Sequence, residues 1–152
     1  MTVLDSFAVL ALLKDEPAAS RVELLIRSDA GAALTALGVV EVLDHLIRLV
    51  GVDEDDAVLD LAQLGLAEPF IVDSSVATRA GLLRARHYHR RSRAVSLADC
   101  VAAETARDRA SHLVTSDPHL LETCAIEGIA YIALADTSGT IWVPDDEEGL
   151  GR

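Results

Sequence analysis

Short apolar runs alternate with amphipathic stretches along most of this chain. The apolar runs predict buried strands at residues 2–4, 32–35, 69–72, 111–117 and 129–134. Apolar positions three and four residues apart predict helices between them, at about residues 7–17, 18–27, 38–50, 53–66, 95–108 and 118–128, with a further helix from Ser74 into a basic cluster. Strands that alternate with helices indicate an α/β fold with a parallel sheet covered on both faces.

Acidic residues stand where several of these elements begin or end. Asp5, Asp73 and Asp117 each directly follow an apolar run, and Glu41 and Asp99 lie early in predicted helices. In a sheet of this kind the carboxyl ends of the strands meet at one edge, where ligands gather. Clustered carboxylates repel one another, so such a cluster favours binding of a hard cation such as Mg²⁺ or Mn²⁺.

Most of these acids also have a structural interpretation. Asp5 is a candidate N-cap, Asp117 precedes a proline as a good N-cap does, and Ser96 with Asp99 resembles a capping box. Glu41 differs, because it lies between Val40 and Val42 on an apolar helical face where an unpaired acid is costly to bury.

Four sequence blocks resemble those of PIN-domain proteins, in particular VapC-type toxins of bacterial toxin–antitoxin pairs. They are, in this order, VLDSFAVLALLKDEP, TALGVVEVL, SLADCVAAETA and LVTSDPHLL, and the resemblance covers residues 2 to about 135. It implies a three-layer α/β/α sandwich around a parallel sheet and a metal-dependent endoribonuclease. We therefore expect a PIN-like nuclease domain at residues 1–136 and a C-terminal extension at 137–152, whose acidic tail has a composition typical of disorder.

The resemblance also implies the site. The family's acidic quartet falls on Asp5, Glu41, Asp99 and Asp117, the expected ligands of Mg²⁺ or Mn²⁺, with Glu41 binding directly or through a water that it orients. Ser6 and Thr115 are expected as hydroxyl donors behind those ligands. Two further acids fall outside the quartet, and we interpret Asp73 as a helix cap and Asp44 as a group behind the ligands.

The implied partners are an RNA substrate, a cognate VapB-like antitoxin and a second copy of the chain in a homodimer. Two alternatives stay open at this point: a housekeeping RNA-processing nuclease of the same fold, and a non-catalytic binding module whose carboxylates only cap helices.

Composition and charge argue against several other classes of protein. The formal net charge of −12 argues against a general nucleic-acid coat, and no apolar run is long enough to span a membrane. The start of the chain does not resemble a signal peptide, so we expect a cytoplasmic protein. Cys100 and Cys124 are too isolated to indicate a disulfide framework or a zinc site, and we expect reduced, buried thiols. No HExxH, GxSxG or glycine-rich phosphate loop is present.

Positive charge is concentrated in the segment RARHYHRRSR, residues 84–93, which holds five of the 13 Lys and Arg residues. If the helix from Ser74 continued through it, Arg79, Arg86, Arg90 and Arg93 would form one stripe. We expect Arg86, Arg90, Arg91 and Arg93 to contact RNA phosphates, and Tyr88 is a candidate for stacking on a base. The structural alternative is a solvated helix end whose cations complement the helix dipole.

Overall fold

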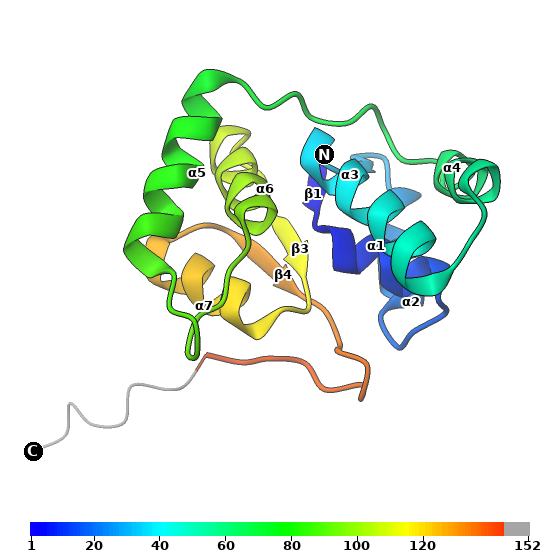
Figure 1. The fold of residues 1–152 in the computed structure, drawn as a ribbon. Coiled ribbons are helices and arrows are strands. Elements are labelled where there is room, and N and C mark those ends of the chain that lie inside the picture. Colours follow the sequence, from blue (N-terminus) through cyan, green and yellow to red (C-terminus); the bar gives the residue numbers. More distant parts are fainter. Residues whose placement is uncertain (145–152) are drawn as a thin grey trace, which may run out of the picture.

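A four-stranded sheet lies at the centre of the molecule, with helices on both of its faces (Figure 1). This computed structural model describes residues 1–144; the acidic run of the expected tail lies outside them. The strands are short and all of their pairings are parallel, in the order β2-β1-β3-β4. Their bounds are β1 Thr2–Leu4, β2 Ala32–Ala33, β3 Leu113–Thr115 and β4 Tyr131–Ala133.

The helices occupy most of the remaining chain. Their bounds are α1 Ser6–Leu13, α2 Ala19–Ile26, α3 Ala36–Asp44, the π-helical η1 His45–Val50, α4 Glu54–Ala62, α5 Ser74–His87, α6 Leu97–Asp108 and α7 Pro118–Glu127. None of these helices is both long and apolar enough to cross a bilayer.

Successive strand residues point to opposite faces of the sheet and so divide the core in two. Val3 and Leu113 belong to a cluster with buried side chains of α5, α6 and α7. Leu4 and Val114 belong to a second cluster with α1, α2 and α3, and Ala57 of α4 joins it. Figure 1 shows the two helical layers on either side of the strands. The predicted three-layer α/β/α fold is confirmed.

Polar caps mark the points where strands pass into helices. Asp5, Ser96 and Asp117 are the N-caps of α1, α6 and α7, and the capping box of Ser96 with Asp99 is present as predicted. These caps fix where each helix begins, and they bring the starts of α1 and α7 to the ends of β1 and β3.

Two predicted elements differ in the structure. Residues 69–72 form no strand: Phe70 makes only a single parallel bridge to Thr35. Pro69 cannot donate a hydrogen bond, and β2 ends at Ala33, so little strand is available for pairing. The helix predicted at 38–50 begins earlier, at Ala36 behind the Thr35 cap, and its last part is the π-helical η1.

Several helices end before their predicted limits. α1 stops at Leu13, shortly before Asp15 with its φ of 53°, and α4 stops at Ala62, shortly before Gly65 with its φ of 76°. The helix predicted from Ser74 reaches the basic cluster but does not continue through it, so the condition for a single arginine stripe is not met. α5 ends at His87 because Tyr88 adopts an extended conformation, and His89 then pairs with Arg93 across a tight turn.

Candidate functional site

The four predicted acids come from four different elements and influence one another electrostatically. Asp5 follows β1, Asp117 follows β3, Asp99 lies in the first turn of α6, and Glu41 lies within α3. The charges of Asp99 and Asp117 raise the pKa of Asp5, Asp117 raises that of Asp99, and Asp99 raises that of Glu41. Asp5, Asp99 and Asp117 therefore act on one another electrostatically, and Glu41 is linked to them through Asp99.

Asp5 is the most deeply buried member, with 3% of its surface exposed. Burial, partly opposed by hydrogen bonds, raises the pKa of its carboxyl from 3.8 to about 7. Its Oδ1 accepts a hydrogen bond from the Ala8 amide at 2.7 Å, and the Thr115 hydroxyl donates to its Oδ2. The Thr115 oxygen in turn accepts from the Asp117 amide at 3.0 Å. Thr115 thus joins two of the four acidic positions.

Asp99 and Asp117 each use one carboxylate oxygen as a helix cap. Oδ2 of Asp99 accepts from the Ser96 amide at 2.7 Å, and Oδ1 of Asp117 accepts from the His119 amide at 2.8 Å. Asp99 is buried, and burial is the main cause that raises its pKa. The other oxygen of each carboxylate accepts no hydrogen bond from residues 1–144.

Glu41 is partly buried and paired with Ser6 from the start of α1. The Ser6 hydroxyl donates to Glu41 Oε2 at 2.9 Å and lowers the pKa of the carboxyl, but burial outweighs it and the net shift is upward. Within the described chain, Oε1 of Glu41 also lacks a hydrogen-bond donor. Both side chains line a small cavity of about 160 Å³.

The donor chemistry of this site fits a hard divalent cation. It offers four carboxylates, and in three of them one oxygen accepts no hydrogen bond from residues 1–144. Carboxylate oxygens are the ligands that Mg²⁺ and Mn²⁺ prefer. Within residues 1–144, however, no group of three or more His, Cys, Asp or Glu side chains is already arranged to hold a metal ion. The side chains point to their caps and hydroxyl partners instead.

The two acids outside the quartet have other contacts. Asp73 is exposed and caps α5, accepting from the Val76 amide at 2.8 Å. Asp44 forms a bidentate ion pair with Arg48 one helical turn later: Arg48 Nε donates to Oδ1 at 2.9 Å and Nη2 donates to Oδ2 at 2.7 Å. The partner of Asp44 is therefore Arg48 and not a member of the quartet. The interpretation of Asp73 as a cap is confirmed.

Two of the five arginines of the basic cluster are paired with acids of α7. Arg86 contacts Glu127 at 3.1 Å and Arg93 contacts Glu122 at 2.8 Å. In the described part of the chain, Arg90 and Arg91 are exposed and form no ion pair. Tyr88 is 44% exposed, and the Arg84 guanidinium lies 4.1 Å from the centre of its ring. The free positive charge of the segment is therefore concentrated at the turn after α5.

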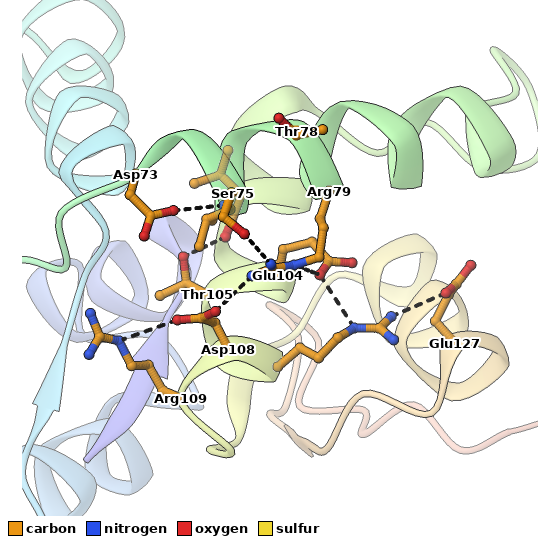
Figure 2. A network of polar contacts seen from close by, with 12 residues as sticks. Asp73, Ser75, Thr78, Arg79, Glu104, Thr105, Asp108, Arg109 and Glu127 are labelled. Atoms are coloured by element: carbon orange, nitrogen blue, oxygen red, sulfur yellow. Dashed lines mark hydrogen bonds and ion pairs between the residues drawn. The ribbon is translucent and has the colours of Figure 1, made fainter.

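A buried ion-pair network centred on α6 was not predicted from the sequence. Glu104 is only 2% exposed, and its Oε2 contacts Arg79 at 3.2 Å and Arg107 at 3.3 Å. Figure 2 shows Arg79 reaching from α5 to both Glu104 and Asp108. Arg79 lies 25 residues before Glu104, so local patterns could not predict this pairing, which joins α5 to α6.

Comparisons with known proteins agree with this fold. The family model described as PIN domain matches residues 2–126. No curated protein is a significant sequence match. Among solved structures, Mycobacterium tuberculosis VapC20, titled a sarcin-ricin loop cleaving toxin, is similar with 16% identity and a TM-score of 0.63, over 86% of this chain and 97% of that one.

Two other solved structures are similar to the same degree. FitAcB from Neisseria gonorrhoeae has 20% identity and a TM-score of 0.63, over 87% of this chain and 96% of that one. VapBC2 from Rickettsia felis, bound to a DNA fragment from its promoter, has 17% identity and a TM-score of 0.63, over 86% and 96%. At these identities the likeness is one of fold.

Proposed function

This chain belongs to the PIN-domain family, and on that premise we propose that it is a divalent-metal-dependent endoribonuclease, the VapC-type toxin of a toxin–antitoxin pair. The observation that carries the proposal is that the charges of Asp99 and Asp117 act on a buried Asp5 whose pKa is raised to about 7, while the charge of Asp99 also acts on Glu41.

Helix capping alone does not account for this arrangement. An N-cap stabilises a helix by about 1 kcal/mol. A rise in the pKa of Asp5 from 3.8 to about 7 corresponds to a cost of about 4 kcal/mol for holding that carboxylate ionised at neutral pH. Asp53 and Asp73 cap α4 and α5 from exposed positions without such burial. The non-catalytic alternative is therefore the weaker one.

In the proposed site, Asp5, Asp99 and Asp117 hold the cation directly and Glu41 binds it or orients the attacking water. A bound Mg²⁺ or Mn²⁺ would lower the pKa of that water and offset the charge that builds on the phosphate. The Thr115 and Ser6 hydroxyls keep Asp5 and Glu41 oriented. Because Asp99 and Asp117 now cap helices, we expect their side chains to turn when the cation binds.

An apolar groove provides a candidate binding site for a protein partner. It has a volume of about 410 Å³, and its lining includes Leu43 of α3 with Val58 and Leu61 of α4. Val58 is 54% exposed, and exposed apolar surface of this kind is typical of interaction sites. We propose that the antitoxin covers this groove, that the toxin acts as a homodimer, and that it cleaves cytoplasmic RNA.

Cleavage of RNA by the purified protein tests the activity. We expect cleavage with Mg²⁺ or Mn²⁺, none with EDTA, and a large loss in Asp99→Asn. Asp73→Asn is the matched control, since asparagine caps a helix as well as aspartate does. Equal cleavage in EDTA, or by Asp99→Asn, would exclude the proposed chemistry.

Expression in cells tests the toxin role. We expect the wild type to arrest growth, Asp99→Asn to be harmless, and a small adjacent antitoxin gene to relieve the arrest. An active enzyme that leaves growth unaffected would favour the RNA-processing alternative instead.

A further inference from the structure

A groove of about 510 Å³ runs along α7, from Pro118 at its start to Ile126 near its end. One wall is the start of α7, with Pro118 and His119; another is the turn after α5, with Ser92; Trp142 and Pro144 of the C-terminal segment close it. Figure 1 shows that turn and the C-terminal segment meeting near α7. Pockets of roughly 300–1,000 Å³ accept small molecules, so the groove has room for a nucleoside.

The groove and the acidic site share one helix start. Pro118 and His119 directly follow Asp117, and the His119 amide donates to Asp117 Oδ1 at 2.8 Å. An RNA strand with its scissile phosphate at the quartet would therefore have its neighbouring nucleotide close to this groove.

Trp142 provides a fixed aromatic surface in the groove. It is the only tryptophan of the chain and is partly exposed. Its ring packs edge-to-face against Tyr131 of β4, with centroids 6.0 Å apart and an interplanar angle of 68°. The segment before it is held by a bridge between Ala135 and Ile141. This support orients the indole before any ligand arrives, which lowers the entropic cost of stacking.

Two arginines directly precede Ser92, which lines the groove. Arg90 and Arg91 adjoin Ser92, and neither forms an ion pair within residues 1–144. The turn that carries them is shaped by His89, whose Nδ1 lies 2.8 Å from the Ser92 hydroxyl. Glu122 also lines the groove, but Arg93 contacts it at 2.8 Å and offsets its charge.

We propose that this groove binds an unpaired nucleotide of the RNA next to the scissile phosphate, with its base stacked on Trp142 and the adjoining phosphates contacted by Arg90 and Arg91. This inference rests on the proposed ribonuclease function. An aromatic surface flanked by arginines is the general means by which proteins hold single-stranded RNA.

The fluorescence of Trp142 tests the proposal directly, because the chain has no other tryptophan. The full chain is titrated in EDTA, where the RNA stays intact, with a single-stranded oligoribonucleotide of about ten nucleotides. We expect saturable quenching. The Trp142 variants have no tryptophan signal, so their affinities, and that of the wild type for comparison, are measured by fluorescence anisotropy of the labelled oligoribonucleotide. Stacking contributes about 1–3 kcal/mol per base, so Trp142→Leu should weaken binding at least 5-fold, while Trp142→Phe should retain most of the affinity. Circular dichroism and Mn²⁺ binding check that both variants are folded.

The arginines are tested by the salt dependence of the same titration. The double variant Arg90→Ala/Arg91→Ala should weaken binding and reduce the slope of log affinity against log salt by about 1.4, for two lost phosphate contacts. Arg21→Ala, which removes an exposed arginine of α2, is the matched control and should leave the slope unchanged.

The outcomes separate this inference from the proposed function. If the wild type cleaves RNA but its fluorescence is unchanged and Trp142→Leu has the same affinity and KM, the groove inference is wrong. Quenching by the antitoxin and not by RNA would assign the groove to protein recognition and also overturn it. Quenching by RNA together with a weaker RNA affinity in Trp142→Leu, without cleavage by the wild type, would support the groove and overturn only the nuclease proposal.

Discussion

Replacing Asp5 by asparagine should make the metal-free protein more stable. The carboxyl is buried, and its pKa rises from 3.8 to about 7, chiefly because burial disfavours the charged form. At about 1.4 kcal/mol per pKa unit, the ionised side chain costs the fold about 4 kcal/mol at pH 7.5. Asparagine carries no charge and can still accept from the Ala8 amide, but it loses the acceptor for the Thr115 hydroxyl. We therefore expect a net gain of about 2 kcal/mol.

The gain in stability from Asp5→Asn should depend on pH. Between pH 4 and 7 folded Asp5 holds a proton that the unfolded chain has released, so the stability of the wild type falls as pH rises through this window. Asp5→Asn lacks this loss. The advantage of the variant should thus be largest at pH 7.5 and shrink towards pH 4.

Urea denaturation in EDTA at pH 7.5 and pH 5 measures the effect. Asp73→Asn, at an exposed cap of α5, is the matched control and should match the wild type at both values. Adding Mn²⁺ at pH 7.5 should stabilise the wild type more than Asp5→Asn. The reasoning is refuted if Asp5→Asn is less stable than the wild type in EDTA, by the 1 kcal/mol or so of a lost cap, with no dependence on pH.

Three further predictions concern the surroundings of the site. Ser6→Ala should remove the hydrogen-bond donor that lowers the pKa of Glu41, and it should weaken Mn²⁺ binding about 10-fold, with a larger loss at pH 6 than at pH 8. Calorimetry measures both affinities, and equal affinities of the wild type and the variant would contradict the role of Ser6. Glu104→Ala should leave Arg79 without its buried partner and lower the free energy of unfolding by about 3 kcal/mol, while Mn²⁺ binding is retained. Urea denaturation measures the loss, and a loss under 1 kcal/mol would refute the stabilising role of Glu104. Hydrogen bonds, chiefly from His87, lower the pKa of Glu127 from 4.5 to about 2, so its contribution to stability is present above pH 4.5 and is lost as pH falls from there through 2. The difference in urea midpoint between wild type and Glu127→Gln should therefore shrink from pH 5 to pH 3, and a constant difference would argue against it.

Much of the fold follows from local pattern. β1, with Asp5 directly behind it, and the capping box at Ser96 are set by neighbours in the sequence, and both are present as predicted. The positions of three of the acids also have a local basis, because Asp5 and Asp117 follow strands, Asp99 lies in the first turn of a helix, and a parallel sheet brings such points together. Glu41 lies in the middle of α3 and does not follow from this rule.

The errors arose where distant residues decide the structure. Residues 69–72 looked like a strand, but the neighbouring strand is too short to pair with them. The basic cluster looked free, but the partners of Arg86 and Arg93 lie on α7, 41 and 29 residues away. The packing of Trp142 on Tyr131 depends in the same way on how the C-terminal segment returns to the sheet.

The central claim is that Asp5, Glu41, Asp99 and Asp117 form one site for a divalent cation. Titration of the wild type and Asp99→Asn with Mn²⁺ by isothermal calorimetry tests it most directly. We expect saturable Mn²⁺ binding by the wild type, accompanied by proton release near pH 7 as Asp5 ionises. In Asp99→Asn the affinity for Mn²⁺ should fall at least 10-fold. Absence of binding by the wild type, or equal binding by Asp99→Asn, would contradict it.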